Sequence, residues 1–380
     1  MNARLLWLCL AALAPCLGGC GNPGASTGQD SGGRDNQDYA EGGIGGSGSG
    51  TASGYGSIWI GGHRHFPVAN DALVRLDGKP VAANSINADG RGLPLGITLE
   101  YLLSDDTNAD LTEGTALRLD AWHQVIGPVT SVSPLSVLGQ PLFHTAETLL
   151  SVPENDLSLL QPGDLLAVAG MPDGLGAIRA TRIARLDEAV LDWQILGRIT
   201  DLTEQDFRIR DQLISRNGIA SENCPATLSN GLKVIVQASA PSRFVSGDRL
   251  DSAYRLICQA EGLSLYAGNR QVPARLPAAF DGVITAIDPL PLRISLNGQA
   301  VNLQPLVDLD PGTLSHVALG VRVEVDGVLD TSSGEIIATR LRARDPLLQL
   351  ETPVNTLPDE VTSLLGTEAL LSSDALSGSR

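Results

Sequence analysis

Two histidines, His63 and His65, are separated by a single residue and could bind a metal ion. On a β-strand such residues point to the same face, so both imidazoles could bind one metal ion, with Asp71 as a nearby carboxylate. A polar strand face or a loop explains the same pattern without a metal. His63 and His65 are therefore metal candidates only, and we predict no bound metal and no cofactor.

Other motifs of catalytic or binding centres are missing from the sequence. The segment Asp106–Asp110 begins like a calcium-binding loop, but Leu111 stands where glycine is needed and Leu117 where the closing glutamate is needed. These two residues exclude an EF-hand, and a looser calcium site is the alternative. No H-E-x-x-H, G-x-S-x-G or phosphate-binding loop occurs. We therefore predict that the chain is not an enzyme, with an envelope hydrolase whose site is dispersed as the alternative.

The first twenty residues have the pattern of a secretion leader. Arg4 precedes an apolar run of about ten residues, Leu5–Ala14, which is too short to span a bilayer. The following Leu17-Gly-Gly-Cys20 resembles the lipobox of bacterial lipoproteins. That resemblance implies that residues 1–19 are a lipoprotein signal peptide and that Cys20 carries the lipid (palmitate). The alternative is an ordinary signal peptide with a coincidental cysteine.

The resemblance also implies a location. Gly21 rather than aspartate follows Cys20, and the sorting rules of Gram-negative bacteria then favour the outer membrane. We expect a protein of the cell envelope that faces the periplasm or the cell surface and contacts the membrane through its lipid anchor.

Two cysteines remain in the body of the chain, Cys224 and Cys258. An even number of cysteines in an oxidising compartment predicts a disulfide between them. Two buried thiols or a metal site are the alternatives, although no histidine lies near either cysteine.

The charge of the chain argues against nucleic acid as a partner. The sequence has 43 acidic residues against 26 Lys and Arg, a net charge of −17, and only 4% aromatic residues. Phosphate binding depends on basic residues, and binding of single strands depends on aromatic stacking. Trp59, Trp122 and Trp193 are interpreted as packing between units rather than as a ligand platform.

Glycine is concentrated between the leader and the first predicted strands. Twelve of the 34 residues from Gly21 to Gly54 are glycine, mixed with Ser, Asp, Asn and Thr. This composition predicts a flexible linker, so residues 20–53 are interpreted as a tether.

The body of the chain contains repeated short β units. Residues 126–186 and 281–343 share one order of elements. Each has a glycine-led strand, a strand ending in a glycine turn, a strand after a glycine, then a turn and a final strand ending in Ala-Thr-Arg-Ile or Ala-Thr-Arg-Leu. Residues 195–259 and 54–125 look like partial copies. Five strands in about 60–70 residues suit a small OB-like barrel or sandwich.

The sequence therefore predicts an all-β fold of tandem small OB-like β-barrels or sandwiches behind a flexible N-terminal linker. The predicted divisions are 1–19 signal peptide, 20–53 tether, 54–125 β unit 1, 126–190 barrel unit 2, 191–275 elaborated unit 3, 276–345 barrel unit 4 and 346–380 mobile tail, in which a short helix could form.

A family resemblance accompanies this repeat. Gly43-Ile-Gly-Gly-Ser-Gly48, the following Gly54-Tyr-Gly-Ser-Ile-Trp-Ile-Gly61 and the Gly-Pro-Val-Thr and Ala-Thr-Arg elements resemble bacterial lipoproteins built from a repeated domain of unknown function. Their domain opens with Gly-Ile-Gly-Gly-Thr-Gly, and Ser47 replaces the threonine here. The resemblance implies no activity. We expect a lipid-anchored binding or structural module whose partners are envelope proteins or polysaccharide, with a polysaccharide- or metal-binding accessory lipoprotein as another alternative.

Overall fold

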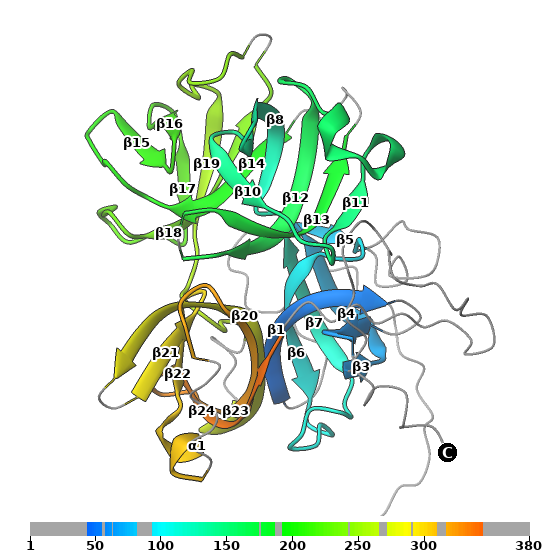
Figure 1. Cartoon of the computed structure of the whole chain (residues 1–380). Coiled ribbons are helices and arrows are strands. Elements are labelled where there is room, and N and C mark those ends of the chain that lie inside the picture. The colour runs from blue at the N-terminus through cyan, green and yellow to red at the C-terminus, as the bar shows by residue number, and fades with distance from the viewer. Residues whose placement is uncertain are drawn as a thin grey trace, which may run out of the picture. The chain divides into compact units, whose positions relative to one another are not determined.

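The computed structural model describes most of the chain between residues 44 and 344. The described ranges are 44–54, 58–62, 64–81, 93–174, 176–186, 192–241, 244–265, 272–289, 292–309 and 317–344. Strands make up almost all regular structure in these ranges, which confirms the all-β prediction (Figure 1). The predicted signal peptide, Cys20, most of the predicted tether and the predicted tail lie outside the described residues.

Within the described ranges, no helix combines the length and the hydropathy that crossing a membrane would require.

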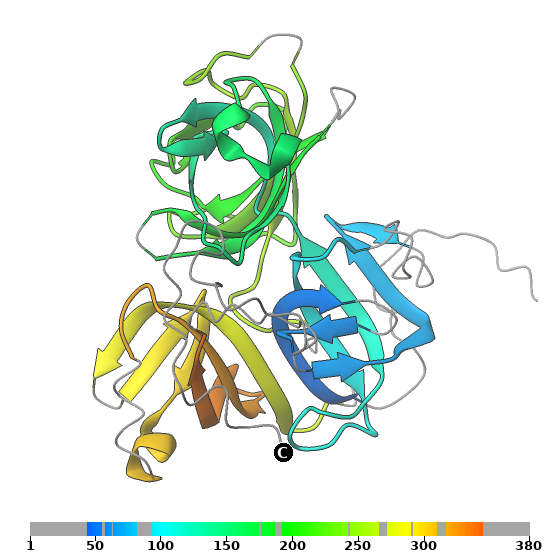
Figure 2. The same cartoon turned by 45° about the vertical axis from the view of Figure 1, so that its right-hand side comes forward.

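Residues 125–185 form a closed five-stranded barrel, which we call barrel 2. Its strands are β8 (Val125–Val132), β9 (Leu135–Val137), β10 (Gln140–Phe143), β12 (Leu165–Pro172) and β13 (Ile178–Arg185). They pair in the order β8–β9–β10–β13–β12 and back to β8, and only the β10–β13 pair is parallel. This Greek-key order, first-second-third-fifth-fourth, is that of the OB-fold. The short β11 (Leu149–Ser151) adds to β13. Figure 2 shows these green strands nearly end-on, as a ring.

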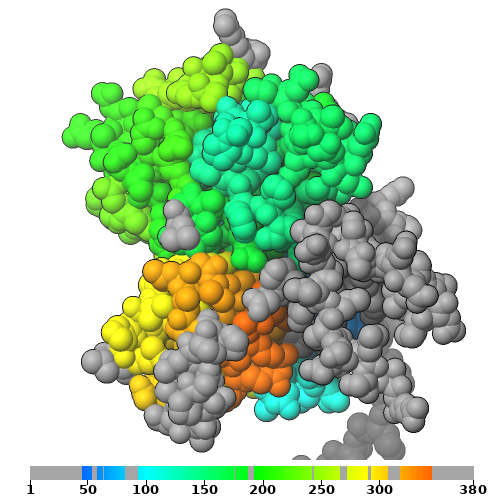
Figure 3. All heavy atoms as spheres, viewed as in Figure 1, coloured from blue at the N-terminus to red at the C-terminus, as the bar shows by residue number. Residues whose placement is uncertain are grey.

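Residues 275–343 repeat the same ring and form barrel 4. Its strands are β20 (Arg275–Pro289), β21 (Leu292–Leu296), β22 (Gln299–Asn302), β23 (Arg322–Asp330) and β24 (Glu335–Ala343). The pairing order is β20–β21–β22–β24–β23 and back to β20, again with one parallel pair, β22–β24. The short helix α1 (Gln304–Leu309) lies between β22 and β23 in the chain. The yellow-to-orange atoms of this barrel pack side by side in Figure 3.

The two partial copies follow the same order. Barrel 1 contains β1 (Ile44–Gly54), β2 (Ile58–Ile60), β3 (Arg64–Phe66), β4 (Val68–Leu76), β5 (Lys79–Val81), β6 (Thr98–Ser104) and β7 (Ala116–Trp122). Barrel 3 contains β14 (Asp192–Arg198), β15 (Asp206–Ile209), β16 (Gln212–Ser215), β17 (Ala220–Glu222), β18 (Lys233–Ser239) and β19 (Ala253–Cys258). In barrel 1 the third strand is split into β3 and β4, and β4 pairs in parallel with β7. In barrel 3 the isolated bridges Thr200–Arg208 and Ile214–Leu250 complete the ring.

The end of the predicted tether is a strand, which corrects the tether boundary. β1 covers Ile44–Gly54 and pairs with β2, β6 and β20. Its glycines serve close packing: a Cβ on Gly48 would lie 2.2 Å from the Tyr101 ring, and one on Gly50 would lie 2.4 Å from Ile60. Glycine permits such close approach of the backbone. The glycine-rich composition therefore marks a closely packed strand here rather than a linker.

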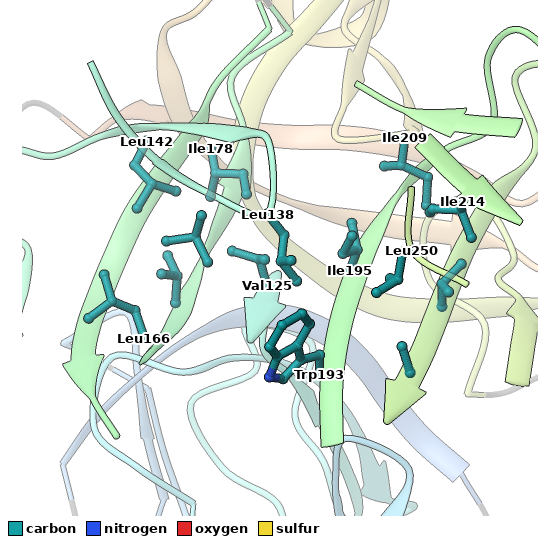
Figure 4. Packing of buried hydrophobic residues seen from close by; sticks show 14 of the residues in the cluster. Val125, Leu138, Leu142, Leu166, Ile178, Trp193, Ile195, Ile209, Ile214 and Leu250 are labelled. Atoms are coloured by element: carbon teal, nitrogen blue, oxygen red, sulfur yellow. The ribbon is translucent and has the colours of Figure 1, made fainter. Parts of the chain in front are cut away.

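The strands join the barrels in pairs. β1 of barrel 1 pairs with β20 of barrel 4, and β8 of barrel 2 pairs with β14 of barrel 3. Barrels 2 and 3 also share one apolar core, in which Val125, Leu138 and Leu166 belong to the same cluster as Trp193 and Ile195 (Figure 4). Barrels 4 and 1 have mainly separate cores. Barrels 1 and 4 are therefore connected by strand pairing, and barrels 2 and 3 by strand pairing and by a common core.

A buried glutamine begins the third strand of three barrels. The side chain of Gln212 donates to the carbonyls of Leu213 and Asp248, both at 2.8 Å. The side chain of Gln299 donates in the same way to the carbonyls of Ala300 and Gly334, both at 2.8 Å. Gln140, at the same position in barrel 2, donates to Leu138 O and Ile209 O. The shared position supports barrel 3 as a further, divergent copy of the repeat.

Candidate functional site

The two body cysteines lie where adjacent strands end. Cys258 ends β19, and Cys224 follows β17, which pairs in parallel with β19. The structure has a disulfide between them, with an S–S distance of 2.06 Å and a Cα–Cα distance of 5.0 Å. The sulfurs are thus neither free thiols nor metal ligands in the structure.

The histidine pair is only partly described. His65, on β3, is exposed and lies directly across from Trp59 on β2, with ring centroids 4.6 Å apart. His63 lies outside the described residues. Among the described residues, no group of three or more His, Cys, Asp or Glu could hold a metal ion.

The three tryptophans have different roles. Trp122 packs against Leu196, Ile235 and Ile257 of barrel 3, as expected of packing between units. Trp193 lies in the shared core of barrels 2 and 3. Trp59 is 38% exposed and its ring lies beside that of His65 of the same barrel, so packing between units stays a prediction for this residue.

A His–Asp pair lies at the junction of barrels 1 and 3. Asp77 occupies the turn between β4 and β5, and its carboxylate contacts His123 twice: Oδ2 at 2.7 Å from Nδ1 and Oδ1 at 2.8 Å from the backbone nitrogen. Gln194 of β14 donates to Asp77 Oδ1 and to His123 O, both at 2.9 Å. A carboxylate that orients an imidazole also occurs in catalytic triads. Here His123 is only 8% exposed, and its partners connect two barrels.

The same junction continues across β18 and β19. Gln237 donates to Asp77 O at 3.2 Å and to the side chain of Gln194 at 3.1 Å. Arg255 donates to Gln237 at 3.1 Å and forms a bidentate ion pair with Glu222 at 2.6 and 2.7 Å. A continuous polar network thus runs from the first barrel into the third.

A buried ion cluster joins barrels 1 and 4. Arg64 of β3 forms ion pairs with Glu324 and Asp326 of β23, and the side chains of Arg64 and Glu324 are 4% and 0% exposed. Arg344 contacts Glu324 and donates to Gly61 O at 2.9 Å, and Arg342 donates to Asp326 at 2.8 Å. Burial alone would lower the pKa of Arg64, but the electrostatic effects of Tyr101, Glu324 and Asp326 and the hydrogen bond to Glu324 outweigh it and raise that pKa. Arg64 therefore stays charged.

The segment after the disulfide, residues 259–265, contacts three barrels; we call it the junction segment. Glu261 forms a bidentate ion pair with Arg198 of barrel 3, at 2.5 and 2.7 Å. The backbone nitrogen of Leu263 donates to Gln299 of barrel 4 at 2.9 Å. The backbone nitrogens of Ser264 and Leu265 donate to Glu100 of barrel 1, the latter at 2.6 Å.

Glu100 of barrel 1 is the buried acid that accepts hydrogen bonds from the junction segment. It lies on β6 across from Asp120 of β7. Burial raises the pKa of Glu100 to about 7, against the opposing effect of the hydrogen bonds from Leu265 and Ser264, and the charge of Asp120 raises it further. The carboxylate therefore titrates near neutral pH.

Glu100→Gln is expected to remove a stability loss that occurs as pH rises. The folded protein keeps the Glu100 proton up to about pH 7, whereas the unfolded chain releases it near pH 4.5, so the free energy of unfolding falls as pH rises between these values. Discounted for partial exposure, the difference is about 2 kcal/mol. Glutamine keeps the acceptor oxygen for both backbone N–H groups and does not titrate. Urea unfolding at pH 4.5, 6 and 7.5 measures the effect.

Glu204→Gln, at an exposed acid, is the control and should leave the pH profile of the wild type unchanged. A Glu100→Gln profile parallel to that of the wild type would contradict the assignment.

Sequence reasoning missed these junction residues, although one signal was present. The strand Arg322–Asp330 begins Arg-Val-Glu-Val-Asp, which puts Glu324 and Asp326 on the same face, together with Arg322, and alternates them with valines. Two acids facing the same way beside buried valines need a cationic partner. Nothing in the local pattern identifies that partner as Arg64.

Comparisons with known proteins match two of the four barrels to one family. The model of a Domain of unknown function (DUF5666) matches residues 126–184 and 281–342, which are barrels 2 and 4. The repeated domain predicted from the sequence is thereby confirmed. No curated protein matches the chain. A solved structure titled "drosophila Unr CSD456" is similar at 15% identity over 59% of this chain and 97% of that chain, with a TM-score of 0.14, too low to support an inference.

Proposed function

We propose that the protein is a lipid-anchored, non-enzymatic component of the cell envelope in which four OB-like barrels form one joined array that presents binding surfaces to envelope proteins or polysaccharide. One observation carries this proposal: the polar side chains best suited to chemistry connect barrels to one another. Asp77 and His123 of barrel 1 both accept hydrogen bonds from Gln194 of barrel 3, Arg64 and Glu324 join barrels 1 and 4, and Glu100 holds the junction segment.

The sequence and the disulfide support an extracytoplasmic location. The leader ends in Leu17-Gly-Gly-Cys20, the pattern of a lipoprotein signal. The Cys224–Cys258 disulfide suits an oxidising compartment. With a net charge of −17, the chain has no excess of basic groups to bind an acidic membrane surface, so a lipid is the more suitable anchor.

The His–Asp pair supports a non-enzymatic role. Both oxygens of Asp77 are bound by His123, and one is shared with Gln194 of a second barrel. In the described part of the chain, no serine, threonine or cysteine side chain is hydrogen-bonded to the His123 ring. A triad would need such a nucleophile next to the base.

Cys20→Ser is expected to release the protein from the membrane fraction, because the thiol that accepts the lipid is lost. Fractionation of cells into soluble and membrane material measures the release, and mass spectrometry of the wild-type N-terminal peptide measures the acyl mass on Cys20. Cys9→Ser, within the same leader, is the matched control and should leave the protein membrane-bound. An unmodified Cys20 thiol in membrane-bound wild type would contradict the proposal.

A further inference from the structure

An exposed aromatic ring and an arginine lie side by side on barrel 2. Phe143 ends β10, and Arg179 is directly opposite it on β13 in the parallel pair. The guanidinium carbon of Arg179 lies 5.9 Å from the centre of the Phe143 ring, and Phe143 is 50% exposed. The pair is thus a cation–π contact that faces solvent.

The guanidinium of Arg179 has no hydrogen bond or ion pair with any described residue. This is unexpected in a chain with 43 acids and 26 Lys and Arg. The surrounding charges are Glu147, Asp281 and Arg322, and the two acids are engaged elsewhere. Asp281 forms a bidentate ion pair with Arg322, and Glu147 lies 3.9 Å from the same arginine.

Arg179 is half-buried, and no described acid forms a direct ion pair with its guanidinium. Burial lowers the pKa of Arg179, and the charge of Arg322 lowers it further, while Glu147 and Asp281 act in the opposite direction. An anion that bound here would gain hydrogen bonds from Arg179 and relieve its repulsion with Arg322.

The pair is specific to barrel 2. In barrel 4 the same register of the third and fifth strands places Asn302 opposite Ile337. Neither an aromatic ring nor a cation occupies that place. The repeat itself therefore does not require the Phe143–Arg179 pair for its fold.

We infer that Phe143 and Arg179 form a binding site for a carboxylate-bearing sugar unit of an acidic polysaccharide. The planar guanidinium can hold a carboxylate through two parallel N–H···O bonds. The exposed face of Phe143 offers a flat apolar surface to the C–H face of a sugar ring. The inference names the ligand class for the binding role proposed above and rests on that role.

The test is titration of the detergent-solubilised full chain with tetragalacturonate, followed by calorimetry. Binding that weakens with added salt is expected from the wild type. Arg179→Ala should weaken it about ten- to one-hundredfold, because the charged hydrogen bonds are lost. Arg179→Lys keeps the positive charge but not the two parallel N–H donors, so its affinity for tetragalacturonate should fall less than that of Arg179→Ala. Phe143→Ala should lose about three- to tenfold.

Controls separate this site from general charge effects. Arg275→Ala, at an exposed arginine of β20, should bind as the wild type does. Neutral maltotetraose and inorganic phosphate should bind at least tenfold more weakly. Equal binding of tetraglutamate would overturn the inference in favour of an acidic peptide, and an Arg179→Ala chain that folds and binds like the wild type would overturn the site. Neither of these two outcomes changes the result expected from membrane fractionation of the wild type. That experiment therefore tests the lipid anchor independently of the binding site.

Discussion

Arg64→Met is expected to lower the free energy of unfolding of the full chain by about 3–4 kcal/mol. The substitution removes the cation that contacts both the fully buried Glu324 and the 18% exposed Asp326, and leaves the buried Glu324 with fewer partners. Asp326 keeps its ion pairs with Arg340 and Arg342. Arg344 still contacts Glu324, which keeps the loss at the lower end of the range for broken buried pairs. Urea unfolding followed by circular dichroism measures the change.

Lys79→Met is the matched control for this experiment. Lys79 also joins two barrels, through a 2.8 Å ion pair with Asp192, but these side chains are 67% and 45% exposed. Exposed pairs contribute about 0–1 kcal/mol, so this variant should unfold almost like the wild type. A loss at Lys79→Met equal to that at Arg64→Met would show that burial of the pair is not the cause.

Removing the disulfide with Cys224→Ser and Cys258→Ser together should cost about 3.5–4 kcal/mol. The two cysteines are 34 residues apart in the chain, and opening that loop returns conformational entropy to the unfolded state. Barrel 3 should suffer most, because the bond ties β19 to the segment after β17. Urea unfolding measures the difference.

A reducing agent supplies an internal control for the disulfide. It should lower the stability of the wild type to that of the double serine variant and should leave the variant unchanged. Wild-type stability that does not respond to complete reduction would contradict the expected contribution.

Local pattern was sufficient to predict the architecture of barrels 2 and 4. Glycine turns such as Leu138-Gly139 and Asn297-Gly298 require positive φ, which both residues of each pair adopt. The strands between these turns are short and alternate in polarity, so their number and spacing predict an OB-like barrel. These elements depend on neighbours within about 60 residues, which is why sequence reasoning identifies them.

The first strand and the junctions depend on distant contacts, and local pattern does not show them. Gly48 and Gly50 suit a linker by composition, but their lack of side chains makes room for Tyr101 and Ile60. Arg64 meets Glu324 across 260 residues of chain. Amino-acid composition indicates only the local preference of the backbone. A closely packed strand or a buried ion pair depends on a partner that is distant in the sequence and adjacent in the fold.

Scanning calorimetry of the wild-type full chain at pH 7.5 tests most directly whether the four barrels are one joined array. Sheets shared through β1–β20 and β8–β14, together with the buried links of Arg64 and Asp77, predict a single transition whose van 't Hoff enthalpy equals the calorimetric enthalpy. Two or more separate transitions in the wild type would contradict a joined array and show barrels that unfold independently.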